Sequence, residues 1–258
     1  MIVSRQNQKI KLIRRLQRCK GDQAVLEGRH LVGEAWRMGL PLELVLVTPD
    51  FAEQPLGQDL LTDRALSVSL VEPGILQQIT DADSPRGVVA VASIPPAPLE
   101  SVPVVEGGLY VYADGVQNPG NLGALARIVE AFAGVALLLG PGTAHANHPR
   151  ALRASAGSLL RLVVSTQVTA PELNRHLKPV SPTWAVMIPR AGTPLDQLEL
   201  PGGVVLAVGA EGPGVSRAVA ALADIEITIP LAGQVESLNS TVAAAIAIYQ
   251  ISRSSLRT

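Results

Sequence analysis

The chain has 258 residues, 47% of them hydrophobic and 17% charged, so it can bury one large core or two smaller ones and is not a disordered or low-complexity protein. Aromatic residues make up only 3%, too few for a surface on which successive bases stack, and the single cysteine excludes an internal disulfide and a thiolate zinc site. The net charge of −1 conceals an asymmetry: residues 1–37 hold nine Lys or Arg against three acids, a local net charge of +6, and the remainder carries −7.

The first segment reads as a basic amphipathic helix. Ile10, Ile13 and Leu16 recur every three residues with Lys and Arg between them. Two interpretations of this charge stay open, namely binding of a polyanion and a helix face that is merely solvated.

An α/β alternation continues to residue 94. Apolar periodicity predicts two helices and two strands, with a turn at Thr48-Pro49-Asp50 after the first strand. In chain order these elements are a helix over 31–38, a strand over 44–47, a helix over 75–80 and a strand over 87–92. Three prolines within residues 95–98 then break any regular element. We therefore expect a first domain over 1–94, a Pro-rich linker over 95–105 and a second domain over 106–258.

Short apolar runs alternate with helical segments throughout the second half. The runs lie at residues 109–113, 135–139, 162–165, 183–188, 204–208 and 225–229. Strands that are apolar on both faces predict a parallel sheet covered by helices on both sides. Ligands of such sheets bind beyond the carboxyl ends of the strands, so the loops that follow the runs are the places to look for a site.

The first such loop, residues 114–123, combines glycines, Pro119 and the two asparagines Asn118 and Asn121, and it opens a helix that contains Arg127. By itself this loop is also explained by a tight turn with an Asn N-cap.

The second loop, Gly209-Ala210-Glu211-Gly212-Pro213-Gly214, is not a dinucleotide fingerprint. It lacks the G-x-G-x-x-G spacing and an acidic residue about 20 positions later. Its glycines let the backbone approach a ligand closely, which suits an adenine or a ribose. A plain left-handed turn with a solvated glutamate is the alternative.

The third loop runs from Ile229-Pro230-Leu231 to Ser237-Leu238-Asn239-Ser240 and leads into an Ala-rich helix over 241–251. Ser237, Asn239 and Ser240 place hydroxyl and amide groups at the helix entrance, where they can cap the helix or orient a ligand. Capping alone explains one or two of them better than all three.

Taken in order, the three loops resemble the three motifs of the SpoU/TrmH family of RNA ribose 2′-O-methyltransferases, in the SPOUT superfamily. The first motif resembles Asn121-Leu122-Gly123 with Arg127 behind it, and the other two resemble the loops at 209–214 and 229–240. Residues 152–158 are similar to a further stretch of the family. Asn118 departs from the pattern, since an acid is common before the proline, and we expect this to alter capping more than chemistry.

The first hundred residues resemble the RNA substrate-binding domain attached to many of these enzymes, which is similar in fold to ribosomal proteins. The similarity is carried by residues 26–32 and 84–90. The resemblance thus implies a smaller N-terminal α/β RNA-binding domain and a C-terminal SPOUT-type parallel sheet with a trefoil knot. It also implies S-adenosyl-L-methionine as cofactor, no metal, a homodimer formed through the knotted domain, and methyl transfer to a ribose 2′-hydroxyl.

The resemblance assigns roles to three groups of residues. The catalytic residues would be Arg127, Asn121, Glu211, Ser237 and Asn239. The cofactor would contact Leu206, Gly209, Gly212, Gly214, Ile229, Leu231 and Leu238. RNA would contact Arg14, Arg15, Arg18 and Arg29. Arg127 would either accept the proton itself or act through a substrate phosphate. The second role is considered because a free guanidinium stays protonated in water. The alternative to any catalytic role is that Arg127 is an ion-paired helix residue.

Other polar residues give weaker signals. His145 and His148 are read as loop residues, since two histidines without a nearby acid or thiol are poor evidence for a metal site. Arg150, Arg153 and Arg161 either extend a basic surface or belong to a solvated helix.

We expect a cytoplasmic methyltransferase acting on ribosomal RNA. The lone cysteine, Cys19, is typical of a reducing compartment, and the sequence shows neither a signal peptide nor a run long enough to span a membrane. An organellar transit peptide is the alternative reading of the Arg-rich opening. The functional alternatives are a tRNA ribose methyltransferase and a non-catalytic RNA-binding or ribosome-assembly protein with the same fold, and the sequence does not reveal which nucleotide is modified.

Overall fold

The computed structural model describes residues 1–17, 21–80, 87–198, 200, 202–232 and 235–255. Contacts within the chain divide it into two compact units, the first made of residues 1–95 and 147–160 and the second of residues 96–146 and 161–258. The segment 147–160, which follows the second strand of the C-terminal half, therefore groups with the N-terminal residues. The predicted division at the Pro-rich linker stays a prediction.

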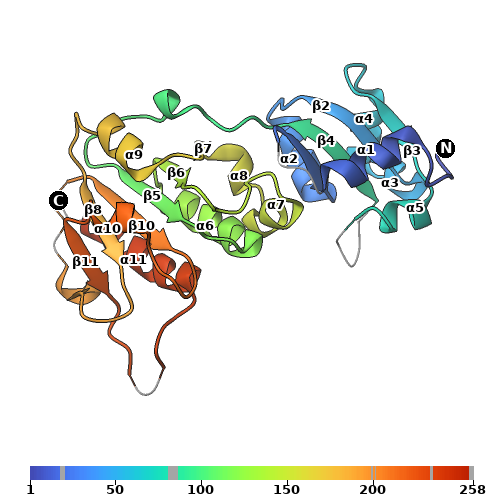
Figure 1. Cartoon of the computed structure of the whole chain (residues 1–258). Coiled ribbons are helices and arrows are strands. Elements are labelled where there is room, and N and C mark those ends of the chain that lie inside the picture. Colours follow the sequence, from blue (N-terminus) through green and yellow to red (C-terminus); the bar gives the residue numbers. More distant parts are fainter. Residues whose placement is uncertain (18–20, 81–86, 199, 201, 233–234, 256–258) are drawn as a thin grey trace. The chain divides into compact units, whose positions relative to one another are not determined.

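The first unit is built on a four-stranded sheet in the order β1-β4-β2-β3, in which β4 is antiparallel to β1 and β2 while β3 is parallel to β2. Its elements, drawn in blue to green in Figure 1, are α1 (Gln8–Leu16), β1 (Gln23–Glu27), α2 (Arg29–Arg37), β2 (Leu42–Val47), α3 (Pro49–Ala52), α4 (Pro55–Thr62), β3 (Val68–Leu70), α5 (Pro73–Gln77) and β4 (Val88–Ser93). Helix α7 (Pro149–Ser155) belongs to the same unit and packs on β1.

Helices cover both faces of this sheet. The predicted basic helix is confirmed as α1, whose Ile10 and Ile13 are buried in one cluster with Ile75 of α5 and the strand residues Val25 and Val91. Because side chains alternate along a strand, the neighbouring residues of β1 and β4 point to the opposite face. Helix α2, which packs on β1 and β4 without joining that cluster, covers this opposite face.

The turn expected at Thr48-Pro49-Asp50 is wrong, because α3 begins there. The Thr48 hydroxyl accepts a hydrogen bond from the Phe51 backbone N–H at 3.4 Å, and Pro49 occupies the first helical position. An N-cap hydroxyl followed by proline is a helix start as well as a turn signal, and burial of Phe51 decides in favour of the helix.

The second unit is built on a seven-stranded sheet in the order β7-β6-β5-β10-β8-β11-β9, and every pairing in it is parallel. Its strands are β5 (Leu109–Asp114), β6 (Ala136–Leu139), β7 (Val164–Thr166), β8 (Thr183–Met187), β9 (Thr193–Pro194), β10 (Val204–Gly209) and β11 (Ile225–Thr228). Its helical elements are η1 (Leu99–Ser101), α6 (Pro119–Ala131), α9 (Ala170–His176), η2 (Leu195–Gln197), α10 (Arg217–Ala220) and α11 (Ser240–Ser255), and α8 (Ser158–Arg161) spans the return of the chain to this unit. The predicted parallel α/β sheet is confirmed, and six of its strands coincide with the six apolar runs.

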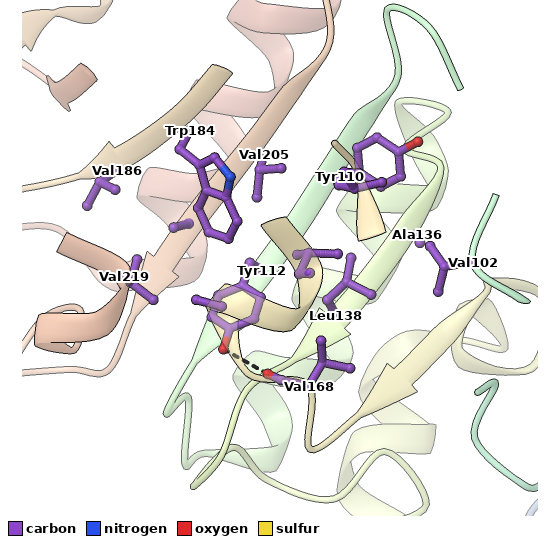
Figure 2. Packing of buried hydrophobic residues seen from close by; sticks show 14 residues of the cluster. Val102, Tyr110, Tyr112, Ala136, Leu138, Val168, Trp184, Val186, Val205 and Val219 are labelled. Atoms are coloured by element: carbon purple, nitrogen blue, oxygen red, sulfur yellow. Dashed lines mark hydrogen bonds between the residues drawn. The ribbon is translucent and has the colours of Figure 1, made fainter. Parts of the chain in front are cut away.

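Both faces of the second sheet are buried. On one face Tyr110 and Tyr112 of β5 pack with Trp184 and Val205 of the neighbouring strands and with helices α9 and α10 (Figure 2). The Tyr112 hydroxyl donates a hydrogen bond to the Val168 carbonyl at 2.8 Å, and burial raises the pKa of this hydroxyl. On the other face α6 and α11 lie side by side (Figure 1).

None of the described helices is long and apolar enough to cross a membrane.

A buried ion pair ties α7 to β1 within the first unit. Arg153 Nη1 donates to Glu27 Oε2 at 2.7 Å, and the Glu27 side chain is 1% exposed. Arg161 pairs with Glu130, also at 2.7 Å through Nη2, but both side chains are about a third exposed. Neither arginine therefore lies on a merely solvated helix.

Replacing Arg153→Ala removes the guanidinium from the buried Glu27 carboxylate, which keeps its hydrogen bond from Gln17 Nε2 at 3.3 Å, and we expect the free energy of unfolding to fall by about 3 kcal/mol. The matched control Arg161→Ala breaks an exposed pair and lowers it by less than about 1 kcal/mol. Urea-induced unfolding measures both values. Equal losses in the two variants would show that burial does not set the strength of the Glu27 pair.

Candidate functional site

The three motif loops meet at one edge of the second sheet. They follow β5, β10 and β11, and the carboxyl ends of parallel strands lie at a common edge. Strand β8 lies between β10 and β11, so its end, at Met187, joins the same group. The order of the strands therefore gathers segments that are separated by up to about 120 residues in the sequence.

Glu211 connects all three loops. Its Oε1 accepts a hydrogen bond from Asn239 Nδ2 at 2.8 Å and a second from Asn121 Nδ2. Asn121 lies in the first turn of α6, which follows β5, whereas Glu211 belongs to the loop after β10 and Asn239 to the loop after β11. One carboxylate thus fixes the relative positions of two amide side chains, so Glu211, although it is an exposed turn residue, has specific side-chain partners.

The two asparagine loops are also fixed by the helices that they open. Asn239 Oδ1 caps α11 by accepting from the backbone N–H groups of Thr241 at 3.0 Å and Val242 at 3.3 Å. The Thr241 hydroxyl donates to the Asn121 carbonyl at 3.3 Å. Asn118 caps α6 through the Gly120 N–H at 2.8 Å. The departure at Asn118 therefore preserves a capping function.

Arg127 lies on α6 and its side chain is exposed. Within the described part of the chain its guanidinium forms no hydrogen bond or ion pair, so the interpretation of Arg127 as an ion-paired helix residue is wrong. Side chains on a helix tilt toward its N-terminus. The Cα–Cβ bond of Arg127 therefore tilts toward the end of α6 that carries Asn121, which is about 9 Å away along the helix axis.

A pocket opens between the ends of β8, β10 and β11 and the start of α11. Its walls are mainly apolar and include Ile188, Pro189 and Val208, while Glu211, Ser237 and Ser240 supply its polar side chains. The Ser240 hydroxyl oxygen is shielded from solvent and forms no hydrogen bond within the described residues. An unused buried hydroxyl is costly, so it indicates a place for a polar ligand.

The part of this pocket formed by the turn after β10 requires a glycine at position 209. A Cβ atom at this position would lie 2.3 Å from the carbonyl carbon of Gly214, so a side chain cannot be accommodated without moving the backbone. The turn itself is closed by mutual backbone hydrogen bonds of 3.1 Å between Ala210 and Gly214. The buried Asp114 carboxylate, at the end of β5, accepts from the Ser216 N–H just beyond the turn.

Most of the cofactor residues expected from the sequence surround this pocket. Those that line it are Gly209, Gly212, Gly214, Ile229, Leu231 and Leu238. Leu206 does not, because it lies three residues before the end of β10 and is fully buried in the sheet. Among the catalytic residues, Glu211 and Ser237 line the pocket, and Asn121 and Asn239 bond to Glu211.

The expected RNA-binding residues do not form one surface. Arg14 and Arg15 lie on α1, whereas Arg29 begins α2 on the other face of the first sheet. Arg18 lies outside the described residues, as do Cys19 and part of the resemblance at residues 84–90.

The sequence interpretation missed several pocket residues, namely Met187, Ile188, Pro189, Val208, Ala210, Ser240 and Ala243. Met187 and Ile188 end the apolar run at 183–188 and Pro189 follows it, so the end of that predicted strand was the available signal. Ser240 was expected to cap the helix or to orient a ligand, but it was not assigned to the cofactor.

The histidine loop has a structural role. His148, expected to be a loop residue, caps α7 by accepting from the Arg150 N–H through Nδ1 at 3.1 Å. No group of three or more potential metal ligands occurs among the residues that the structure describes.

Known proteins share this sequence pattern over both halves of the chain. A model of the SpoU rRNA Methylase family matches residues 108–249, and a model of the MRM3-like substrate binding domain matches residues 7–90. The 23S rRNA (guanosine(2553)-2′-O)-methyltransferase RlmP of Bacillus subtilis is 31% identical over 254 residues, which cover 97% of this chain and 98% of that relative.

Solved structures share the fold. An RNA 2′-O ribose methyltransferase superposes with a TM-score of 0.83 at 28% identity, covering 99% of both chains. The SpoU methyltransferase AviRb from Streptomyces viridochromogenes, in complex with AdoMet, gives a TM-score of 0.88 over 97% of this chain and 99% of that chain, and at 23% identity it is a likeness of fold. With the family pattern covering more than half of its length, this chain belongs to the SpoU rRNA methylase family.

Proposed function

We propose that this protein transfers a methyl group from S-adenosyl-L-methionine to a ribose 2′-hydroxyl of ribosomal RNA. The observation that carries the proposal is the Asn121–Glu211–Asn239 hydrogen-bonded group, whose Glu211 lines a mainly apolar pocket and whose Asn121 lies on the same helix as the unpaired Arg127. The full-length similarity to a 23S rRNA ribose methyltransferase supports both the reaction and the class of RNA.

The pocket fits the proposed cofactor. Apolar walls suit an adenine ring, the Gly209 turn brings backbone groups to the pocket surface, and the Ser240 hydroxyl is available for a polar atom. Gly209, Gly212 and Gly214 would contact the cofactor from one side and Ile229, Leu231 and Leu238 from the other. When bound, S-adenosyl-L-methionine supplies an electrophilic methyl group on a sulfonium.

Arg127 acts on the nucleotide. Transfer of a methyl group to a hydroxyl requires that the hydroxyl proton be removed. A guanidinium is a poor acceptor because it stays protonated, but it holds a phosphate by paired hydrogen bonds. We assign Arg127 to the phosphate beside the reacting ribose, where it positions that phosphate to take the proton.

The asparagines and Ser237 orient the ribose. Each amide that donates to Glu211 keeps its remaining N–H and its oxygen in a fixed direction. Ser237, which is exposed at the pocket, adds a hydroxyl to the same site. This fixed arrangement reduces the entropy lost on aligning the reacting groups.

We further propose that the C-terminal unit is threaded as a trefoil knot and forms a homodimer, and that the enzyme acts in the cytoplasm, where its rRNA substrate is assembled.

The dimer proposal rests on α11. Its residues Val242, Ile246 and Tyr249 follow helical spacing and are 50%, 40% and 47% exposed. Three large apolar side chains on one helical stripe favour an interface.

Replacing Arg127→Ala should lower methyl transfer to Bacillus subtilis 23S rRNA by at least about 100-fold, because the phosphate loses its positioning cation. Binding of S-adenosyl-L-methionine, measured by calorimetry, should stay within a few-fold. Radiolabelled methyl incorporation and mapping of 2′-O-methyl positions measure the activity. The control Arg175→Ala removes an exposed arginine from α9 and should leave turnover unchanged; normal turnover after Arg127→Ala would refute the assignment.

Exchanging donor and acceptor tests the role of Glu211. Asn121→Asp places a second carboxylate against Glu211 and should lower kcat by about 100-fold, because an attractive hydrogen bond becomes a repulsion. Adding Glu211→Gln restores one donor and one acceptor across the contact and keeps an oxygen for Asn239. The double variant should therefore recover at least about tenfold in kcat. A double variant no better than Asn121→Asp alone would mean that this contact does not support catalysis.

Replacing Ile246→Glu should convert a dimer into a monomer, because burying a charged residue at an apolar contact is unfavourable. Sedimentation velocity measures the change. Leu61→Glu, which alters an equally exposed residue of α4 in the first unit, should leave the dimer intact. A monomeric unaltered protein would contradict the dimer proposal.

A further inference from the structure

The first unit contains a basic hollow between α2 and the start of α4. Its lining includes Arg29, His30 and Arg37 from α2, with Gln54 and Pro55 on the opposite side. None of the described lining residues is acidic, but His30 Nε2 lies 3.6 Å from the Glu34 carboxylate and 3.2 Å from the Ala156 carbonyl oxygen. The hollow lies wholly within the substrate-binding unit and is separate from the pocket described above.

The two arginines of the hollow are unpaired. Both are exposed, and within the described part of the chain neither guanidinium forms a hydrogen bond or an ion pair. Arg29 occupies the first position of α2, and the first turn of that helix holds no acid. The positive end of a helix dipole disfavours a cation at this position. The charge of Arg29 is therefore unfavourable there unless an anion binds beside it.

The start of α4 adds to the positive potential. Gln54 provides no side-chain cap, and the first turn of α4 contains no acidic residue. The free backbone N–H groups at a helix start attract anions. Two guanidiniums and an uncapped helix start thus border one concave surface.

The hollow has a fixed shape. The Trp36 indole N–H of α2 donates to the Asp63 carboxylate at the end of α4 at 2.9 Å. Gly33 lets the helices approach closely, since a Cβ there would lie 2.9 Å from a methyl carbon of Leu56. The cations of α2 are therefore held at a set separation from α4, which favours a ligand of regular charge spacing.

The helix dipole distinguishes Arg29 from the arginines of α1. Arg14 and Arg15 lie in the last turn of α1, where the dipole favours cations, and Arg37 lies likewise in the last turn of α2, so only Arg29 is disfavoured by its helix. Arg14 and Arg15 also lie on the other face of the sheet from α2. One RNA strand seated in the hollow cannot lie along α1 at the same time without passing around the sheet.

We propose that the hollow formed by Arg29, His30, Arg37 and the start of α4 binds backbone phosphates of the substrate RNA, and that α1 is outside this contact. The inference rests on the proposed function, because it names where the same RNA is held. It extends the expected RNA contacts to Arg37 and removes Arg14 and Arg15 from them, while His30 lines the hollow with its Nε2 held by the Ala156 carbonyl.

The test compares two charge-matched double variants of the full-length protein. Arg29→Gln with Arg37→Gln alters the hollow, and Arg14→Gln with Arg15→Gln removes the same charge from α1. Filter binding of protein-free Bacillus subtilis 23S rRNA over a series of salt concentrations measures affinity and salt dependence. For the hollow variant we expect about tenfold weaker binding at 0.1 M salt and a slope of log K against log salt smaller by about 1 to 2. The α1 variant should stay within about twofold.

Two further measurements separate the possible failures. Melting temperatures of both variants should equal that of the unaltered protein, because none of the four arginines forms a hydrogen bond or ion pair among the described residues and only Arg14 is partly buried. Equal losses of affinity in the two variants, or no loss in the hollow variant, would overturn the inference while leaving methyl transfer by the unaltered protein intact. Absence of rRNA binding and methylation by the unaltered protein would instead refute the proposed function.

Discussion

The site depends on one carboxylate that accepts hydrogen bonds from two loops. Glu211 receives the amides of Asn121 and Asn239, and these three residues come from the ends of three different strands. The bonds join segments that would otherwise be independent surface turns. Because each asparagine loop also opens a helix, the positions of α6 and α11 depend on the same contacts. The polar groups available to a substrate are thus oriented before any substrate arrives.

The parallel sheet makes this junction possible. Strand β10 lies between β5 and β8, so the glycine loop after β10 is flanked on both sides by strand ends that also carry loops. The absence of a side chain at Gly209 then lets the backbone fold back on Gly214 and leaves an apolar pocket beneath. The apolar pocket and the amide cluster share Glu211, so the sites that we propose for the methyl donor and for the ribose adjoin one another.

The charge of the chain is divided unevenly within the first unit. The basic excess is confined to residues 1–37, while the 22 acidic residues are split equally between the two units, and the basic N-terminal residues are distributed over both faces of a small sheet. Only the α2 face combines its arginines with an uncapped helix start in a concave surface. Another basic side chain, Arg153 of α7, stabilises the fold instead, because it pairs with the buried Glu27 of β1. Local charge density therefore does not by itself locate RNA contacts.

The sequence by itself determined the parallel sheet, the family and the residues of the junction, because apolar runs of strand length and short motif loops are local signals. It correctly placed Gly209, Ile229 and Leu238 at the pocket but wrongly included Leu206. Leu206 lies three residues before the end of β10 and is buried in the core of the sheet. Only the tertiary structure decided that Glu211 joins two asparagines, that Ser240 has an unused hydroxyl, and that residues 147–160 pack with the N-terminal unit. It also separated Arg14 from Arg29, because strand alternation sends the helices at either end of β1 to opposite faces. These features depend on contacts between residues far apart in the chain, which no local pattern of apolar and polar residues encodes.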